Sequence, residues 1–67
     1  MNKILVIGTG SIGRRHIQCL NEFGVPEIFV CEPVDANLQA VRSMFDIRGS
    51  FTDLKQALPH KFDGAIR

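Results

Sequence analysis

Residues 3–16 read Lys-Ile-Leu-Val-Ile-Gly-Thr-Gly-Ser-Ile-Gly-Arg-Arg-His, and this stretch decides the fold. A run of four apolar residues leads directly into glycines with the spacing Gly8-x-Gly10-x-x-Gly13. An acidic residue, Glu32, follows 19 positions after the last glycine. A buried strand, this glycine spacing at the start of a helix, and a downstream acid are typical of a dinucleotide-binding βαβ unit. The sequence therefore predicts a site for a nucleotide cofactor.

Apolar stretches alternate with helical patterns along the rest of the chain, which predicts a parallel sheet built from βαβ units. Strands are expected at 3–7, 27–32, 47–50 and 63–67. Helices are expected at 11–23 and 36–45, with a helix of one to two turns after residue 53. The predicted fold class is α/β: a truncated, doubly wound Rossmann-type sheet with the order β-α-β-α-β-α-β.

The spacing of apolar residues predicts which helix faces are buried. Three sets are expected to face the core: Ile12, Cys19, Leu20 and Phe23 in the first helix; Leu38, Val41 and Phe45 in the second; Leu54, Ala57 and Leu58 in the third. Helix ends are predicted from capping residues. They are a left-handed Gly24, an N-cap at Asp35, and a capping box of Asp53 and Gln56.

Each glycine of the loop has its own expected role. Gly8 permits the tight turn off the strand, Gly10 lets the pyrophosphate approach the backbone, and Gly13 lets the helix pack close to the strand. The N–H groups of the first helical turn then face the phosphates. Ser11 is expected to add a hydroxyl hydrogen bond, and Ile12 to pack under the loop. An alternative interpretation is a glycine-rich turn without a ligand.

Glu32 is expected at the end of the second strand, where a carboxylate can accept hydrogen bonds from both hydroxyls of the adenosine ribose. A carboxylate there would repel a 2′-phosphate, so NAD is the expected cofactor. NADP stays open because Arg14, just past the third glycine, is close enough to reach a phosphate. The plainer interpretations are a solvated strand end for Glu32 and a solvent-exposed helix position for Arg14.

Composition argues against several classes of partner. The formal net charge of +1 gives no basis for binding nucleic acid or a membrane surface. No apolar run approaches the ~18 residues of a membrane span, and the chain is expected to be cytoplasmic. Cys19 and Cys31 match no metal or redox spacing and are interpreted as small buried hydrophobes. His16 is interpreted as a packed helix residue, and the pattern identifies no catalytic residue and no metal ligand.

The stretch from Ile4 to His16, with Gly-Ser-Ile-Gly followed closely by a histidine, resembles the glucose–fructose oxidoreductase / inositol dehydrogenase (Gfo/Idh/MocA) family. Three later segments add to the resemblance: Val30-Cys-Glu-Pro33, Phe51-Thr-Asp-Leu54 and Phe62-Asp-Gly-Ala-Ile66. The resemblance implies an oxidoreductase that transfers a hydride between a nicotinamide cofactor and a hydroxyl of a sugar or polyol.

Members of that family are longer and have a second domain with a catalytic lysine and a histidine or aspartate. The resemblance therefore implies that residues 1–67 are the N-terminal part of a dinucleotide-binding domain, without the catalytic and substrate domain. Such a piece would bind the adenosine and pyrophosphate of the cofactor but would not catalyse, and only the full-length parent would bind the sugar or polyol.

Two other hypotheses stay open. A nucleotide-sensing regulatory domain that binds NAD without being an enzyme has the same strand, glycine loop and acid. An incomplete sheet also leaves an unpaired edge, which favours self-association with a second copy of the chain.

Overall fold

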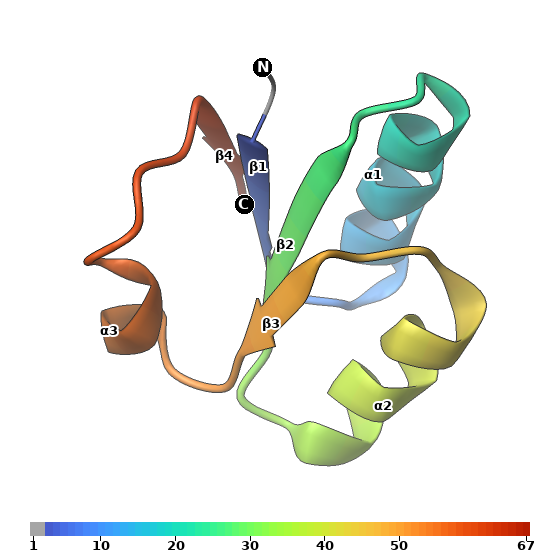
Figure 1. The fold of residues 1–67 in the computed structure, drawn as a ribbon. Coiled ribbons are helices and arrows are strands. Elements are labelled where there is room, and N and C mark those ends of the chain that lie inside the picture. The colour runs from blue at the N-terminus through green and yellow to red at the C-terminus, as the bar shows by residue number, and fades with distance from the viewer. Residues whose placement is uncertain (1–2) are drawn as a thin grey trace.

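Residues 3–67 fold into a four-stranded parallel sheet and three helices (Figure 1). The computed structural model describes residues 3–67. The elements are β1 (Lys3–Ile7), α1 (Ser11–Glu22), β2 (Glu27–Cys31), α2 (Asp35–Met44), β3 (Gly49–Phe51), α3 (Leu54–Ala57) and β4 (Gly64–Ile66). The α/β class and the parallel sheet predicted from the sequence are confirmed.

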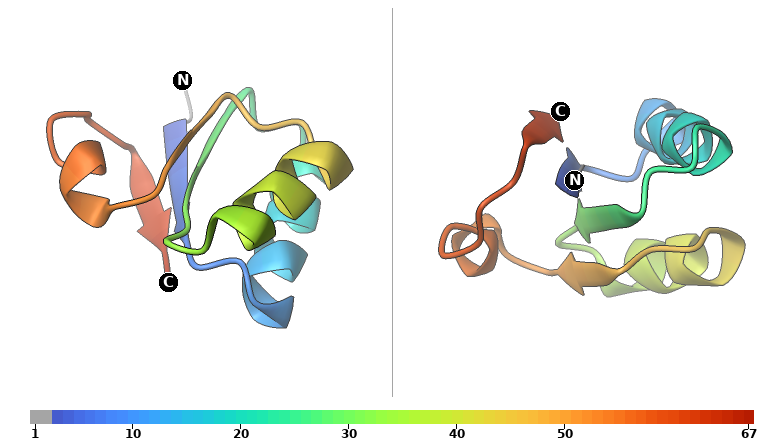
Figure 2. Two further views of the ribbon diagram at one scale, coloured as in Figure 1. Left: turned by 90° about the horizontal axis from the view of Figure 1, so that it is seen from below. Right: turned by 45° about the horizontal axis from the view of Figure 1, so that its top comes forward.

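The strands lie in the order β3-β2-β1-β4, so that the first strand of the chain is an inner strand. β1 pairs with β2 from Lys3↔Glu27 to Ile7↔Cys31, and with β4 from Ile4↔Gly64 to Val6↔Ile66. Since all pairs are parallel, the carboxyl ends of the strands meet at one edge of the sheet. α1 and α2 cover one face of the sheet and α3 lies over the other (Figures 1 and 2).

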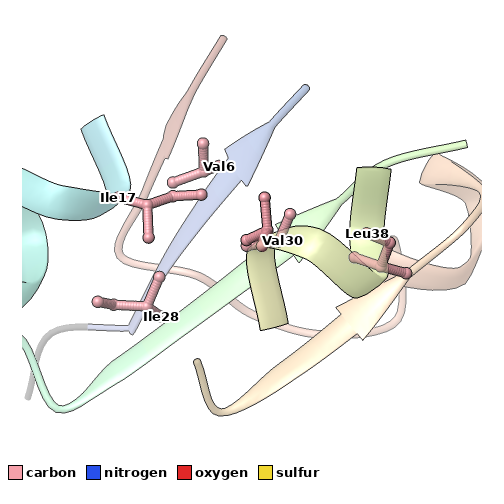
Figure 3. Packing of buried hydrophobic residues seen from close by; sticks show 6 residues of the cluster. Val6, Ile17, Ile28, Val30 and Leu38 are labelled. Carbon is pink, nitrogen blue, oxygen red and sulfur yellow. The ribbon is translucent and has the colours of Figure 1, made fainter. Parts of the chain in front are cut away.

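The face under α1 and α2 carries the main apolar core (Figure 3). Alternate residues of the inner strands point to it, because side chains of a strand alternate between the two faces. We call this set the apolar layer; its buried members are Val6, Ile17, Ile28, Val30, Leu38 and Val41. The predicted inward face of the second helix is confirmed, since Leu38 and Val41 are buried and Phe45 packs against them.

The face under α3 is covered less completely. Its buried residues are Leu5, Cys31 and Ala57. Around them lie partly buried aromatic rings, with Phe29 and Phe62 edge-to-face at 5.5 Å between centroids. The ammonium of Lys3 lies 5.1 Å from the centroid of Phe29, within the range of a cation–π contact.

Of the three residues predicted to be buried in and next to α3, two are not buried. Ala57 is buried, but Leu58 is 73% exposed and Leu54 also lies at the surface. A helix of four residues presents little more than one position to the sheet, and the small Ala57 side chain occupies that position against the central strands.

The predicted inward face of α1 is wrong for three of its four residues, and only Leu20 packs against the core as expected. Ile12 and Phe23 are 70% and 86% exposed, and Cys19 is exposed, whereas Ile17 is fully buried. Gly13 touches the backbone of Gly8, so a methyl group at position 13 would lie 2.2 Å from the Gly8 carbonyl oxygen. This contact turns the helix so that the position four residues later, rather than Ile12, faces the sheet.

The ends of the helices agree with the predictions except at α2. Gly24 has φ +75°, and Val25 N–H donates to the Leu20 carbonyl at 3.1 Å, as in a Schellman cap. The capping box that opens α3 is present. Asp35 is not an N-cap: Val34 takes that position and Asp35 is the first helical residue, where its charge still suits the helix dipole.

None of the helices in residues 3–67 is long and apolar enough to cross a membrane.

Candidate functional site

The glycine loop connects β1 to α1 at the carboxyl edge of the sheet. Gly8 has φ +91°, a conformation that favours glycine, and its N–H donates to the Cys31 carbonyl at 2.9 Å. The chain thus leaves β1 in the sharp turn that the sequence predicted for Gly8. Three residues later, α1 begins at Ser11 without a side chain capping its first turn.

Gly10 and Gly13 differ in what surrounds them. A methyl group at Gly13 would collide with the Gly8 backbone, so the close approach of helix and strand requires glycine there. A methyl group at Gly10 would meet nothing within 4 Å. Gly10 therefore leaves open space beside the loop, and no other part of the protein fills that space.

A hollow of about 380 Å³ lies against the loop, and we call it the glycine hollow. It is formed between the ends of β1 and β4, with the first turn of α1 beside it. Its lining residues are Ile7, Gly8, Gly10, Ser11, Ile12, Gly13 and Arg67. Five of the six predicted cofactor-binding residues are thus brought together around one hollow. The prediction that Ile12 packs under the loop is wrong, because Gly13 makes the contact with Gly8 and leaves Ile12 exposed.

A second hollow of about 380 Å³ adjoins the first and shares Ile7 and Gly8 with it. It lies over the ends of β1, β2 and β3, and its lining is mainly apolar. The remaining lining residues are Cys31, Pro33, Thr52, Asp53 and Leu54. The two hollows together follow the carboxyl edge of the sheet across all four strands.

Glu32, the sixth predicted residue, lines neither hollow. Its side chain is 5% exposed, and both carboxylate oxygens accept hydrogen bonds from the protein. Oε1 accepts from the amide and the hydroxyl of Thr9 at 2.9 and 2.5 Å, and Oε2 accepts from the amide of Val34 at 2.9 Å. Glu32 is therefore not the solvated strand-end residue of the plainer interpretation, and a contact with ribose stays a prediction.

These contacts control the ionisation of Glu32. The hydrogen bond from the Thr9 hydroxyl has the largest effect and lowers the pKa of Glu32, while burial opposes it. Hydrogen bonds from two amides and the charge of Arg14 lower the pKa further. Glu32 is consequently a buried carboxylate that stays negatively charged at neutral pH.

Thr9 is the residue that the sequence analysis missed. It is 2% exposed, and its carbonyl accepts a hydrogen bond from Arg14 Nε at 3.0 Å. Arg14 is thus held against the loop rather than being the solvent-exposed helix residue of the plainer interpretation. The sequence feature that could have identified this contact is a hydroxyl residue between Gly8 and Gly10, together with an acidic residue directly after the next strand.

Cys31 lines the second hollow, but its thiol is not activated. Burial, with the nearby charges of Asp53 and Glu32, raises the pKa of the Cys31 thiol, which disfavours the thiolate that a nucleophile needs. Within residues 3–67, no group of three His, Cys, Asp or Glu side chains is arranged to hold a metal ion. Cys19 is exposed rather than buried as expected, and both cysteines are free thiols.

Comparisons with known proteins found no matching protein-family model, no matching curated protein and no matching solved structure. The resemblance to the Gfo/Idh/MocA family accordingly stays a prediction from the sequence.

Proposed function

We propose that this chain binds the adenosine and pyrophosphate of a nicotinamide dinucleotide, as part of an oxidoreductase that acts on a hydroxyl of a sugar or polyol. The observation that carries the proposal is the glycine hollow. It joins a left-handed Gly8, an unobstructed Gly10 and the uncapped first turn of α1 at the carboxyl edge of a parallel sheet. Helix N–H groups in this position favour a pyrophosphate.

The topology supports the same proposal. The strand order β3-β2-β1-β4 agrees with the first half of a doubly wound dinucleotide-binding sheet. In such sheets ligands bind outside the carboxyl ends of the strands, where the strand order reverses. The glycine hollow lies at this reversal, between the ends of β1 and β4. The adjoining apolar hollow is in position to take the adenosine.

Charge favours NAD over NADP in this proposal. Glu32 lies at the end of β2 and its lowered pKa keeps it negative, so it repels a 2′-phosphate even though its oxygens face Thr9 and Val34. Arg14 acts in the opposite direction, and it keeps NADP as the second choice. The oxidoreductase role, and a cytoplasmic location, rest on the sequence alone.

Calorimetric titration of the 67-residue chain with NAD, NADP and ADP tests the proposal. We expect NAD and ADP to bind with similar affinity and NADP to bind more weakly. Gly10→Ala should lower NAD affinity at least tenfold, because the added methyl group enters the hollow without touching the protein. The matched control is Gly64→Ala, where the methyl group meets only Ile4 at an ordinary 3.5 Å, far from the loop.

Lack of NAD and ADP binding by a chain that is folded by circular dichroism would contradict the proposal. Equal affinity of wild type and Gly10→Ala would place the ligand elsewhere. We also expect the chain alone to reduce no NAD with sugars or polyols, and measurable reduction at 340 nm would contradict that part. The regulatory alternative shares the binding site, and no observation on these residues favours it over the oxidoreductase.

A further inference from the structure

The carboxylate of Glu32 is already occupied. A carboxylate has about four acceptor positions, and three of them are used by the Thr9 amide, the Thr9 hydroxyl and the Val34 amide. Binding both hydroxyls of a ribose would require breaking at least one of these hydrogen bonds. Breaking it would leave a donor at Thr9 or Val34 without its partner, and a lost hydrogen bond to a charged acceptor is expensive.

Thr9 links this carboxylate to the glycine loop. Its amide and hydroxyl bind Glu32 on the β2 side, and its carbonyl accepts from Arg14 Nε on the α1 side at 3.0 Å. The residue between Gly8 and Gly10 is therefore held from two directions and is almost fully buried. With Thr9 turned inward, Gly10 and the start of α1 are left to line the hollow.

We propose that Glu32 and Thr9 form a clamp that fixes the glycine loop in its pyrophosphate-binding shape, and that Glu32 acts as a positioning residue rather than as the reader of the ribose. We call these two residues the loop clamp. The inference rests on the proposed function, since it assumes that the loop binds a nucleotide. In this inference the Glu32 carboxylate binds the glycine loop of the protein and does not bind the ribose of the ligand.

Two variants and three ligands separate the two roles. Glu32→Gln replaces an oxygen that accepts by an amide that donates, and Thr9→Val removes the hydroxyl while keeping the shape of the side chain. The ligands are ADP, 2′-deoxy-ADP and inorganic pyrophosphate, which contain the full ribose, a ribose without the 2′-hydroxyl, and no sugar. Glu22→Gln on the exposed side of α1 is the matched control for the change at position 32.

If the loop clamp acts as proposed, wild type binds ADP and 2′-deoxy-ADP with affinities within about twofold. Both variants then weaken all three ligands by a common factor of about tenfold, and the double variant is little weaker than either single one. If Glu32 reads the ribose, Glu32→Gln weakens ADP selectively and leaves pyrophosphate unchanged, while Thr9→Val affects none of the ligands. The second pattern would overturn the inference.

A ligand-free measurement tests the loop clamp separately from the proposed function. In ¹H–¹⁵N spectra of the wild-type chain, the amides of Thr9 and Val34 should shift together with pH, following one carboxyl group, and the Glu22→Gln control should retain these shifts. Failure of either amide to follow that group would overturn the loop clamp, whatever the binding results. If both amides follow it but no ligand binds, the proposed function fails and the loop geometry stands.

Discussion

The apolar layer and the loop clamp are both buried, and they meet at the end of β2, but different forces hold them. The apolar layer is held by non-directional burial of aliphatic side chains between the sheet and two helices. The loop clamp is held by directional hydrogen bonds to one ionised carboxylate. The first region should therefore respond to changes in volume, and the second to changes in charge and donor geometry that leave the volume unchanged.

The largest effect is expected from Ile17→Ala in the apolar layer. Ile17 is fully buried, and removing such a side chain costs about 3 kcal/mol of unfolding free energy. That is a large share of the stability of a small domain. Urea unfolding followed by circular dichroism measures it. Ile12→Ala is the matched control on the same helix, because Ile12 is 70% exposed and its loss should cost under about 0.5 kcal/mol. Equal losses would mean that α1 packs on another face.

Gly13→Ala should give the next largest loss of stability, because Gly13 lies where α1, which packs on the apolar layer, contacts the glycine loop. The added methyl group would lie 2.2 Å from the Gly8 carbonyl oxygen, so the backbone of the loop or of α1 has to move. We expect a loss of about 2 kcal/mol in unfolding free energy, of the size seen for overpacked sites. Gly64→Ala should be close to neutral in the same unfolding experiment, since its methyl group has room. A neutral Gly13→Ala would show that helix and strand are not in close contact.

Glu32→Gln should cost about 1.5 kcal/mol although the side chain keeps its size. The glutamine amide group is a donor, so it must face either the donors of Thr9 or the amide of Val34. Urea unfolding at pH 7 measures the loss, and Glu22→Gln on the exposed side of α1 should change stability by under about 0.5 kcal/mol. If both substitutions are neutral, the carboxylate is not holding the loop.

The smallest effect is expected from protonating Glu32 in the wild-type chain, because a neutral carboxyl keeps part of its hydrogen bonding. Its pKa in the folded chain is below the ordinary 4.5, so the unfolded chain takes up the proton first. The stabilisation is therefore complete above about pH 5 and decreases as pH falls through 4.5 and then through the folded pKa. Unfolding midpoints between pH 3 and pH 7 should show this slope, and Glu32→Gln should flatten it while Glu22→Gln does not.

Local sequence patterns predicted the elements of the fold well and the side-chain contacts less well. The strand before Gly8, the left-handed Gly24 and the capping box at Asp53 are local patterns, and the structure agrees with each. Leu20 was predicted correctly, but the other three inward residues of α1 were not, because the orientation of the helix depends on the contact between Gly13 and Gly8, which the periodicity of apolar residues does not contain.

The same distinction explains the site. Glycine spacing predicted which residues gather around the hollow. The burial of Glu32 depends on a hydrogen bond donated by the hydroxyl of Thr9, 23 positions away in the chain, and on another donated by the amide of Val34 in the turn before α2. The second contact also accompanies the shift of the N-cap from Asp35 to Val34. Contacts of this kind follow from the assembled sheet and not from any local pattern.

The inner position of β1 has a consequence for the order of folding. β1 meets β2 after about one helix of intervening chain, but it meets β4 only when Lys3 and Asp63 come together across 60 positions. Closing the longer loop costs more chain entropy, so the β1–β2 pair should form early and β4 should add last. Until β4 pairs, one edge of β1 has unpaired backbone groups. The rate of β4 pairing therefore determines how long strands of other chains can pair with β1 instead.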